Sequence, residues 1–337
     1  MHNLLDPAIL FFIFGALAGA VKSNLEIPQP ISRFLALYLL MALGLKGGFA
    51  LAHSGFTVQV ATSLGCAVLL AVAVPLLGYF LLRRVLSGFD AAAVAATYGS
   101  VSAVTFVTAV QTLENQQVVF GGYMSAAMAL MESPAIILAI VFANAMRQQP
   151  TSAVAGTRGG SAVLALPSSS QRASVPFGKI LHESFTDGAQ LLLLGAMVIG
   201  ILSGDAGKAA MQPFSGDLFK GMLAFFLLDM GLLTARSLPQ VKGKSPWLIA
   251  YAVLGPLTHA SLALGLCALL DIPVGDTILL MVLAASASYI AVPAVMRYAV
   301  PEANPSLYFG LSLGITFPLN ILFGIPLYSY VAKAVLA

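Results

Sequence analysis

Two short runs of hydroxyl residues interrupt otherwise apolar stretches and could hold a small anion. The runs are GSVSAVT (99–105) and ASASYIA (285–291), the second followed by Pro293. Glycine and proline tolerate or cause a helix interruption, and the helix that restarts beyond it presents unpaired N–H groups with partial positive charge, which suits an anion. The small residues would let a compact anion approach the backbone. The predicted substrate-binding residues are Gly99, Ser100, Ser102, Thr105, Ser286, Ser288 and Tyr289.

The two runs match at a constant offset, which indicates an internal repeat. Asp90 is followed ten and twelve residues later by serines, and so is Asp276, so that both matches have an offset of 186 residues. Ser, Thr and Gly are also common where transmembrane helices pack closely, as in GALAG (15–19), and this structural interpretation stays open for each run taken alone. Two runs in register favour a ligand site.

Charged and polar residues within apolar segments add candidates for cation binding. Glu132 lies in MESPAI and Asp229 in LLDMGLL, where a carboxylate could bind Na⁺ or a proton, or pair with a base such as Lys46. Thr316 and Asn320 are polar residues of the last apolar segment, around Pro318.

The composition sets the class of protein that must position these residues. Of 337 residues, 59% are apolar and 9% are charged, and the mean hydropathy is +0.94. Soluble domains carry about 25% charged residues, so the chain is predicted to be an all-α polytopic membrane protein. The net charge of +3 gives no reason to expect nucleic acid, and no nucleophile–base set or metal cluster indicates an enzyme.

Apolar segments fall into two groups of five, separated by a Ser-, Gly- and Pro-rich stretch. We expect a first five-helix repeat at 1–146, a flexible cytoplasmic linker at 147–178 and a second five-helix repeat at 179–337. An odd number of spans in each half would make the repeat inverted, the usual construction of secondary transporters, with the fourth helix of each half broken. The predicted spans are 8–22, 34–51, 57–82, 90–112, 118–146, 187–203, 215–236, 246–270, 275–297 and 305–335.

The distribution of basic residues predicts the orientation. If the loops after odd-numbered spans share one side, twelve Lys and Arg residues gather there and four lysines lie on the other side. The positive-inside rule then places both termini outside and the linker in the cytoplasm. The four outer lysines would be Lys46, Lys208, Lys220 and Lys333.

The chain resembles the sodium-dependent bicarbonate transporter family over about residues 25 to 330, apart from the linker. The similar stretches are LEIPQPISRFLALYLLMALGLKGG (25–48), GSVSAVTFVTAVQTLE (99–114), MESPAIILAIVFAN (131–144), ASASYIAVPAVMRYAVPEANPSLYFG (285–310) and FPLNILFGIPL (317–327). The resemblance implies a ten-span inverted repeat in the bacterial inner membrane, assembled as a homotrimer, that imports bicarbonate with Na⁺ between its two broken helices. It also implies a PII-like regulatory partner on the cytoplasmic side.

The second run departs from the family pattern at the position that matters most for a cation. Tyr289 stands where the family has an aspartate, and Ala291 and Val292 replace a Ser and a Gly; in the first run, Ala103 and Val104 replace a Gly and a Ser. Na⁺ prefers oxygen ligands that include an anionic one. The candidate cation-binding residues are Glu132, Ser102, Thr105 and Ser288. No other cofactor is expected.

Two function classes therefore stay open. The first is a secondary transporter of bicarbonate or a similarly small monovalent anion. Because Tyr289 replaces an aspartate, either its Na⁺ coupling is weakened or Glu132 supplies the negative charge, and Tyr289 could instead donate a hydrogen bond to the anion. The second is a regulatory membrane protein of the same fold that does not transport and engages a PII-like partner.

Overall fold

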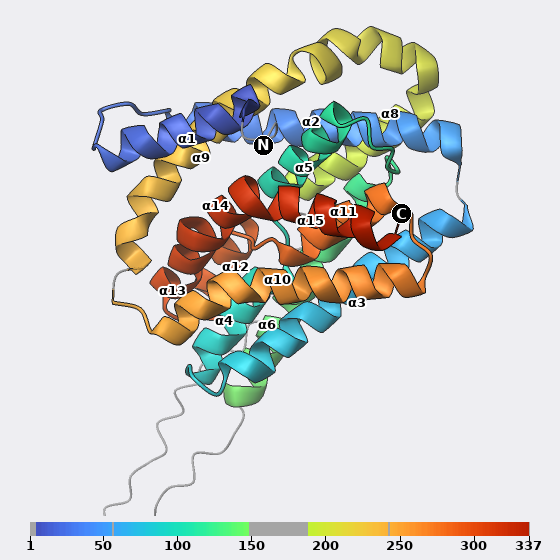
Figure 1. The fold of residues 1–337 in the computed structure, drawn as a ribbon. Helices are drawn as coiled ribbons and strands as arrows, with labels where there is room; N and C mark the ends of the chain where they lie inside the picture. Colours follow the sequence, from blue (N-terminus) through green and yellow to red (C-terminus); the bar gives the residue numbers. More distant parts are fainter. Residues whose placement is uncertain (1–4, 56, 148–187, 242, 337) are drawn as a thin grey trace, which may run out of the picture.

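The computed structural model describes residues 5–55, 57–147, 188–241 and 243–336, and within these ranges the chain is helical with no strand (Figure 1). The first group of helices comprises α1 (Pro7–Ala20), α2 (Gln29–Ser54), α3 (Val58–Leu82), α4 (Gly88–Gly99), α5 (Ala103–Asn115) and α6 (Met124–Arg147). The second group comprises α8 (Gly188–Met211), η2 (Gln212–Asp217), α9 (Phe219–Ser237), η3 (Leu238–Val241), α10 (Pro246–Leu269), α11 (Val274–Ala285), α12 (Ala291–Ala299), α13 (Pro305–Leu311), η4 (Ser312–Thr316), α14 (Phe317–Leu319), η5 (Asn320–Gly324) and α15 (Ile325–Leu336).

Seven helical stretches of the described chain are long and apolar enough to cross a membrane, and two shorter apolar helices accompany them. This confirms the predicted multi-pass helical class. One of the seven, Gly188–Ser237, contains two of the predicted spans. Within it, Gly204 has φ 54° and ψ −142°, a conformation that glycine adopts readily, so the chain turns inside the stretch.

The helix boundaries differ from the predicted segments at the end of the first group. The apolar segment expected from residue 118 becomes helical only at Met124, since the chain from Gln116 to Tyr123 forms a loop. The predicted linker lies outside the described residues, apart from Arg147 at the end of α6.

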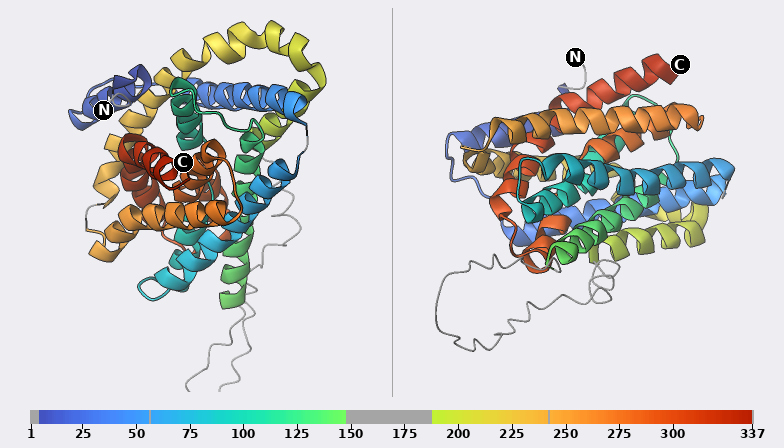
Figure 2. Two further views of the ribbon diagram at one scale, coloured as in Figure 1. Left: turned by 45° about the vertical axis from the view of Figure 1, so that its right-hand side comes forward. Right: turned by 90° about the horizontal axis from the view of Figure 1, so that it is seen from below.

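Helices from the two halves pair closely along one side of the molecule. There α1 packs against α9 and α2 against α8, as the blue and yellow helices show in Figures 1 and 2. Glycines permit this approach, because an added Cβ at Gly15 would lie 2.2 Å from the Leu228 carbonyl oxygen, and one at Gly48 would lie 2.1 Å from that of Met197. The GALAG segment thus serves helix packing.

The helices that precede the two hydroxyl runs form the centre of the bundle. All residues from Ala91 to Gly99 of α4 and from Gly275 to Ala285 of α11 are buried. Helix α3 covers α4 and α10 covers α11, an equivalent arrangement in the two halves. The cysteines, Cys66 and Cys267, are buried in the same apolar core and form no disulfide.

Candidate functional site

Both hydroxyl runs interrupt a helix. Helix α4 ends at Gly99 and α5 begins at Ala103, while α11 ends at Ala285 and α12 begins at Ala291. The backbone is extended at Ser100 (φ −89°, ψ 179°) and Ser286 (φ −80°, ψ 164°), so neither helix continues through its run. The second break is shorter than expected, since Pro293 lies in the first turn of α12 and does not end the break. Proline is well tolerated there because first-turn N–H groups lack helical partners.

The two breaks lie directly against each other in the buried core. The backbone N–H of Ser102 donates to Oγ of Ser286 at 2.9 Å, and the N–H of Ser288 donates to the carbonyl oxygen of Thr97 at 2.8 Å. The two segments that match at an offset of 186 residues therefore lie side by side, although neither bond joins a pair of matching residues. The second break thus satisfies a backbone donor of the first, and the last turn of α4 satisfies a backbone donor of the second, which permits irregular backbone inside a membrane bundle.

Several of the predicted hydroxyls are bonded within the protein. Ser102 caps α5, its Oγ accepting from the N–H of Thr105 at 3.2 Å and from Oγ1 of Thr105 at 2.9 Å. Ser288 accepts from the N–H of Val292 at 3.3 Å. These bonds fix the starts of both restarting helices, α5 and α12. Between Ser102 and Thr105, the N–H groups of Ala103 and Val104 belong to the first turn and have no acceptor within α5.

Ser100 differs from the other hydroxyl residues of the runs. Its side chain is buried, with 1% of the residue exposed, and its Oγ has no hydrogen-bond partner among the described residues. A buried hydroxyl without a partner is costly and calls for an explanation such as a ligand. Gly99, beside it, has a packing role: an added Cβ would lie 2.4 Å from the ring of Pro75 in α3.

Tyr289 connects the second break to the paired helices. Its hydroxyl lies 3.5 Å from Sδ of Met230 in α9, and its ring packs edge-on against Phe317 with centroids 5.1 Å apart. The same hydroxyl lies beside Ser102 of the other break. A neutral phenol thus occupies the junction of α9 with both breaks.

The two acidic candidates lie on different helices, Glu132 on α6 and Asp229 on α9. Glu132 is half-buried on α6, next to the buried Met131, and α6 packs beside α4. Asp229 of α9 is 5% exposed and accepts a hydrogen bond from the Ser32 hydroxyl at the start of α2. The structure therefore satisfies Asp229 without the lysine considered for it.

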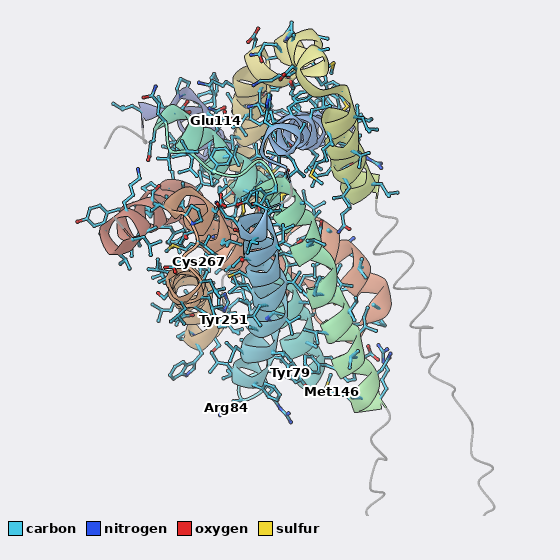
Figure 3. The ribbon with its side chains drawn as sticks, turned by 90° about the vertical axis from the view of Figure 1, so that its right-hand side faces the viewer. Tyr79, Arg84, Glu114, Met146, Tyr251 and Cys267 are labelled. Atoms are coloured by element: carbon cyan, nitrogen blue, oxygen red, sulfur yellow. The ribbon has the colours of Figure 1, made fainter. Side chains whose placement is uncertain are left out.

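Lys46 has a different partner from the carboxylate considered for it. Its Nζ lies 3.0 Å from Oε1 of Glu114 and 4.2 Å from the centroid of the Phe219 ring, at the end of α5. Hydropathy does not reveal how α2 is rotated about its own axis, and this rotation decides that Lys46 meets Glu114. Figure 3 shows Glu114 at one end of the molecule and Arg84 and Met146 at the opposite end.

Polar residues that the sequence did not assign to the site bond to the helices that lead into the two breaks, α11 and α4. Nδ2 of Asn320 donates to the carbonyl oxygen of Ala285 at 2.8 Å, and Oδ1 of Asn320 accepts from the Tyr328 hydroxyl at 2.9 Å. Thr316 bonds to the hydroxyl of Tyr98 in α4 at 2.7 Å. Thr316 and Asn320 could have been assigned from the sequence, because they are polar residues within an apolar segment. Nothing in the sequence singled out Tyr98.

Among the described residues, no group of three or more His, Cys, Asp or Glu side chains could hold a metal ion. Hydroxyl and carbonyl oxygens at the breaks are hard ligands of the kind that a small cation prefers. A multi-pass helical bundle in which two broken helices meet is an architecture typical of secondary transporters.

The family comparison agrees with this class. The family model of the Na⁺-dependent bicarbonate transporter superfamily matches residues 7–333, nearly the whole chain, and the chain belongs to this family. A comparison with curated proteins returns no match. The family is one of transporters, which argues against an enzyme.

Proposed function

We propose that the chain imports bicarbonate, or a similarly small monovalent anion, through a site between the two breaks. The observation that carries the proposal is the buried Ser100 hydroxyl, next to the first turn of α5, for which the described part of the chain offers no hydrogen-bond partner. A hydroxyl donor and helix N–H groups in a buried setting suit a compact anion. The substrate-binding residues proposed are those of the two runs, with Gly99 in a packing role.

We propose ten crossings as a five-plus-five inverted repeat, with both termini outside. Reciprocal packing of α1 with α9 and of α2 with α8 supports the repeat, as do the bonds by which the backbone N–H of Ser102 and of Ser288 each reach the opposite half. Arg83 and Arg84 follow α3 and Arg147 ends α6, which supports a cytoplasmic position for this end in the bacterial inner membrane.

We propose that anion uptake is only weakly coupled to Na⁺. Ser102, Thr105 and Ser288 bring hydroxyl oxygens to the breaks, but Tyr289 adds no negative charge there. The charge would then come from Glu132 on α6. A homotrimer and a PII-like cytoplasmic partner are proposed on the family resemblance alone.

Uptake of labelled bicarbonate into proteoliposomes, with and without a Na⁺ gradient, tests the function. Ser102→Ala and Ser288→Ala should impair uptake without loss of folded protein. Ser261→Ala is the matched control, since Ser261 is an exposed residue of α10 whose hydroxyl donates to the carbonyl oxygen of Leu257 in its own helix. Saturable uptake indifferent to Na⁺ would support the role given to Tyr289. No uptake of any small anion under either gradient would refute transport.

A second candidate function, a regulatory protein without transport, is favoured by the closure of the breaks. Ser102, Ser286 and Ser288 are each at most 4% exposed and bonded within the protein. Such a protein would bind a PII-like partner yet give no uptake, so the proteoliposome assay separates the two candidates.

A further inference from the structure

Two aspartates outside the breaks hold the loops of the opposite half. Oδ1 of Asp276, in the first turn of α11, accepts from the N–H of Gly121 at 2.7 Å, in the loop between α5 and α6. Oδ1 of Asp90, in the first turn of α4, accepts from the N–H of Asn304 at 2.8 Å, in the loop between α12 and α13. These are the two aspartates that match at the offset of 186 residues.

The second carboxylate oxygen of each aspartate accepts from a hydroxyl. Oδ2 of Asp276 accepts from the Tyr123 hydroxyl, and Oδ2 of Asp90 accepts from Oγ of Ser87 at 2.7 Å. We call these two groups the Asp276 anchor (Asp276, Gly121 and Tyr123) and the Asp90 anchor (Asp90, Asn304 and Ser87).

Each anchor joins a pair of helices that is also joined, at the other end, by one of the bonds near the breaks. From Ser102 the chain runs along α5 to Gly121, crosses to Asp276, and returns along α11 to Ser286, which bonds to Ser102. Helices α5 and α11 are therefore bonded at both ends of their contact.

The Asp90 anchor joins the other two half-helices in the equivalent way. From Thr97 the chain runs back along α4 to Asp90, crosses to Asn304, and returns along α12 to Ser288, which bonds to Thr97. Helices α4 and α12 are likewise bonded at both ends.

We propose that Asp276 and Asp90 are positioning residues of the anion site, each setting the axial position of one pair of half-helices; this rests on the proposed function. A helix advances about 1.5 Å per residue. If one helix of a pair moved along its axis by one residue at an anchor, the distance from the Ser102 nitrogen to Oγ of Ser286 would increase from 2.9 Å to beyond hydrogen-bonding distance. Asp276 thereby controls the Ser102–Ser286 bond, and Asp90 controls the Thr97–Ser288 bond.

The two anchors are unequal. Asp276 is 1% exposed and receives a further weak bond from Ser63 of α3 at 3.5 Å, whereas Asp90 is half-buried. Water can replace a partner lost at Asp90 but has poor access to Asp276. The Asp276 anchor therefore has the larger effect.

Hydrogen exchange of the purified full chain tests the proposal without any substrate. In Asp276→Ala, exchange should rise about tenfold, the factor expected when one net hydrogen bond is lost, in peptides that contain the Ser102 amide. In Asp90→Ala, it should rise in peptides that contain the Ser288 amide, and by less. Asp205→Asn, an exposed carboxylate of α8, is the control and should change neither.

Two milder variants keep the test valid if Asp276→Ala does not fold. Asp276→Asn retains an acceptor for Gly121 and should restore most protection, while Tyr123→Phe removes only the hydroxyl and should give an intermediate rise. In uptake assays, Asp276→Ala should raise the KM for bicarbonate more than it lowers the maximal rate.

The proposal is overturned if exchange rises only around Gly121 or Asn304, or if both variants affect both breaks equally. If the wild-type chain gives no uptake, the proposed function fails, while the exchange pattern still decides whether the anchors position the breaks.

Discussion

Replacing Ser100 or Ser286 by alanine should separate a ligand-binding hydroxyl from a structural one. Both residues are at most 1% exposed and both lie in a break. Oγ of Ser286 accepts from the N–H of Ser102 at 2.9 Å and donates to the carbonyl oxygen of Leu283 at 2.9 Å, whereas Oγ of Ser100 has no partner in the described chain. The same chemical change therefore removes different interactions.

The expected magnitudes follow from these contacts. Ser286→Ala leaves the buried N–H of Ser102 without an acceptor, which costs about 1–3 kcal/mol of the free energy of unfolding. Ser100→Ala removes a hydroxyl that is already unsatisfied, so the free energy of unfolding should stay unchanged or rise slightly. If that hydroxyl donates to a bound anion, its loss weakens binding by about 1.5–3 kcal/mol, roughly 10- to 150-fold.

Thermal unfolding in detergent and bicarbonate uptake in proteoliposomes measure the two effects on the same preparations. We expect a lower melting temperature only for Ser286→Ala, and a raised KM at an unchanged melting temperature for Ser100→Ala. Equal destabilisation by both variants, with no change in KM for Ser100→Ala, would refute the assignment of Ser100 to the site.

Three further changes probe the cation site, helix packing and an ion pair. Tyr289→Asp should increase the Na⁺ dependence of uptake by adding a negative charge at the breaks, whereas Tyr289→Phe should not; equal Na⁺ dependence in both would contradict this. Gly48→Ala should lower the free energy of unfolding by about 1–3 kcal/mol, because the added Cβ would meet the backbone of α8. In the same unfolding assay, Gly195→Ala is the control and should be neutral or stabilising, because open space surrounds Gly195. Arg147→Lys should lower the melting temperature, because lysine cannot reproduce the two bonds to Glu302 of 2.9 and 2.7 Å; an unchanged value would show that the pair is dispensable.

The positions of the breaks could be predicted from sequence because their causes are local. Hydroxyl residues within apolar runs, with Gly99 before the first, indicate interruption, and helices α4 and α11 do end there. The details around them could not be predicted. Pro293 falls inside α12, and Gly99 serves close packing against Pro75, a residue of another helix.

The sequence predicted least well which polar residues pair with one another. Hydropathy placed Lys46 near an apolar segment but carried no information on the direction in which its side chain points, and its partner is Glu114 on α5. Likewise, the offset of 186 residues marked Ser102 and Ser288 as equivalent. Equivalence does not predict that the N–H of Ser102 bonds to Ser286 in the other break, or that the N–H of Ser288 bonds to Thr97 at the end of α4.

The sequence alone determined that this chain is a multi-pass helical membrane protein and where two of its helices are interrupted. Apolar length and backbone preference act over a few residues, so they can be read along the chain. The tertiary structure decided which polar atoms are satisfied by protein and which, like Oγ of Ser100, are not. Bonds such as that between Asp276 and Gly121 join residues far apart in the chain, and their formation depends on how whole helices pack.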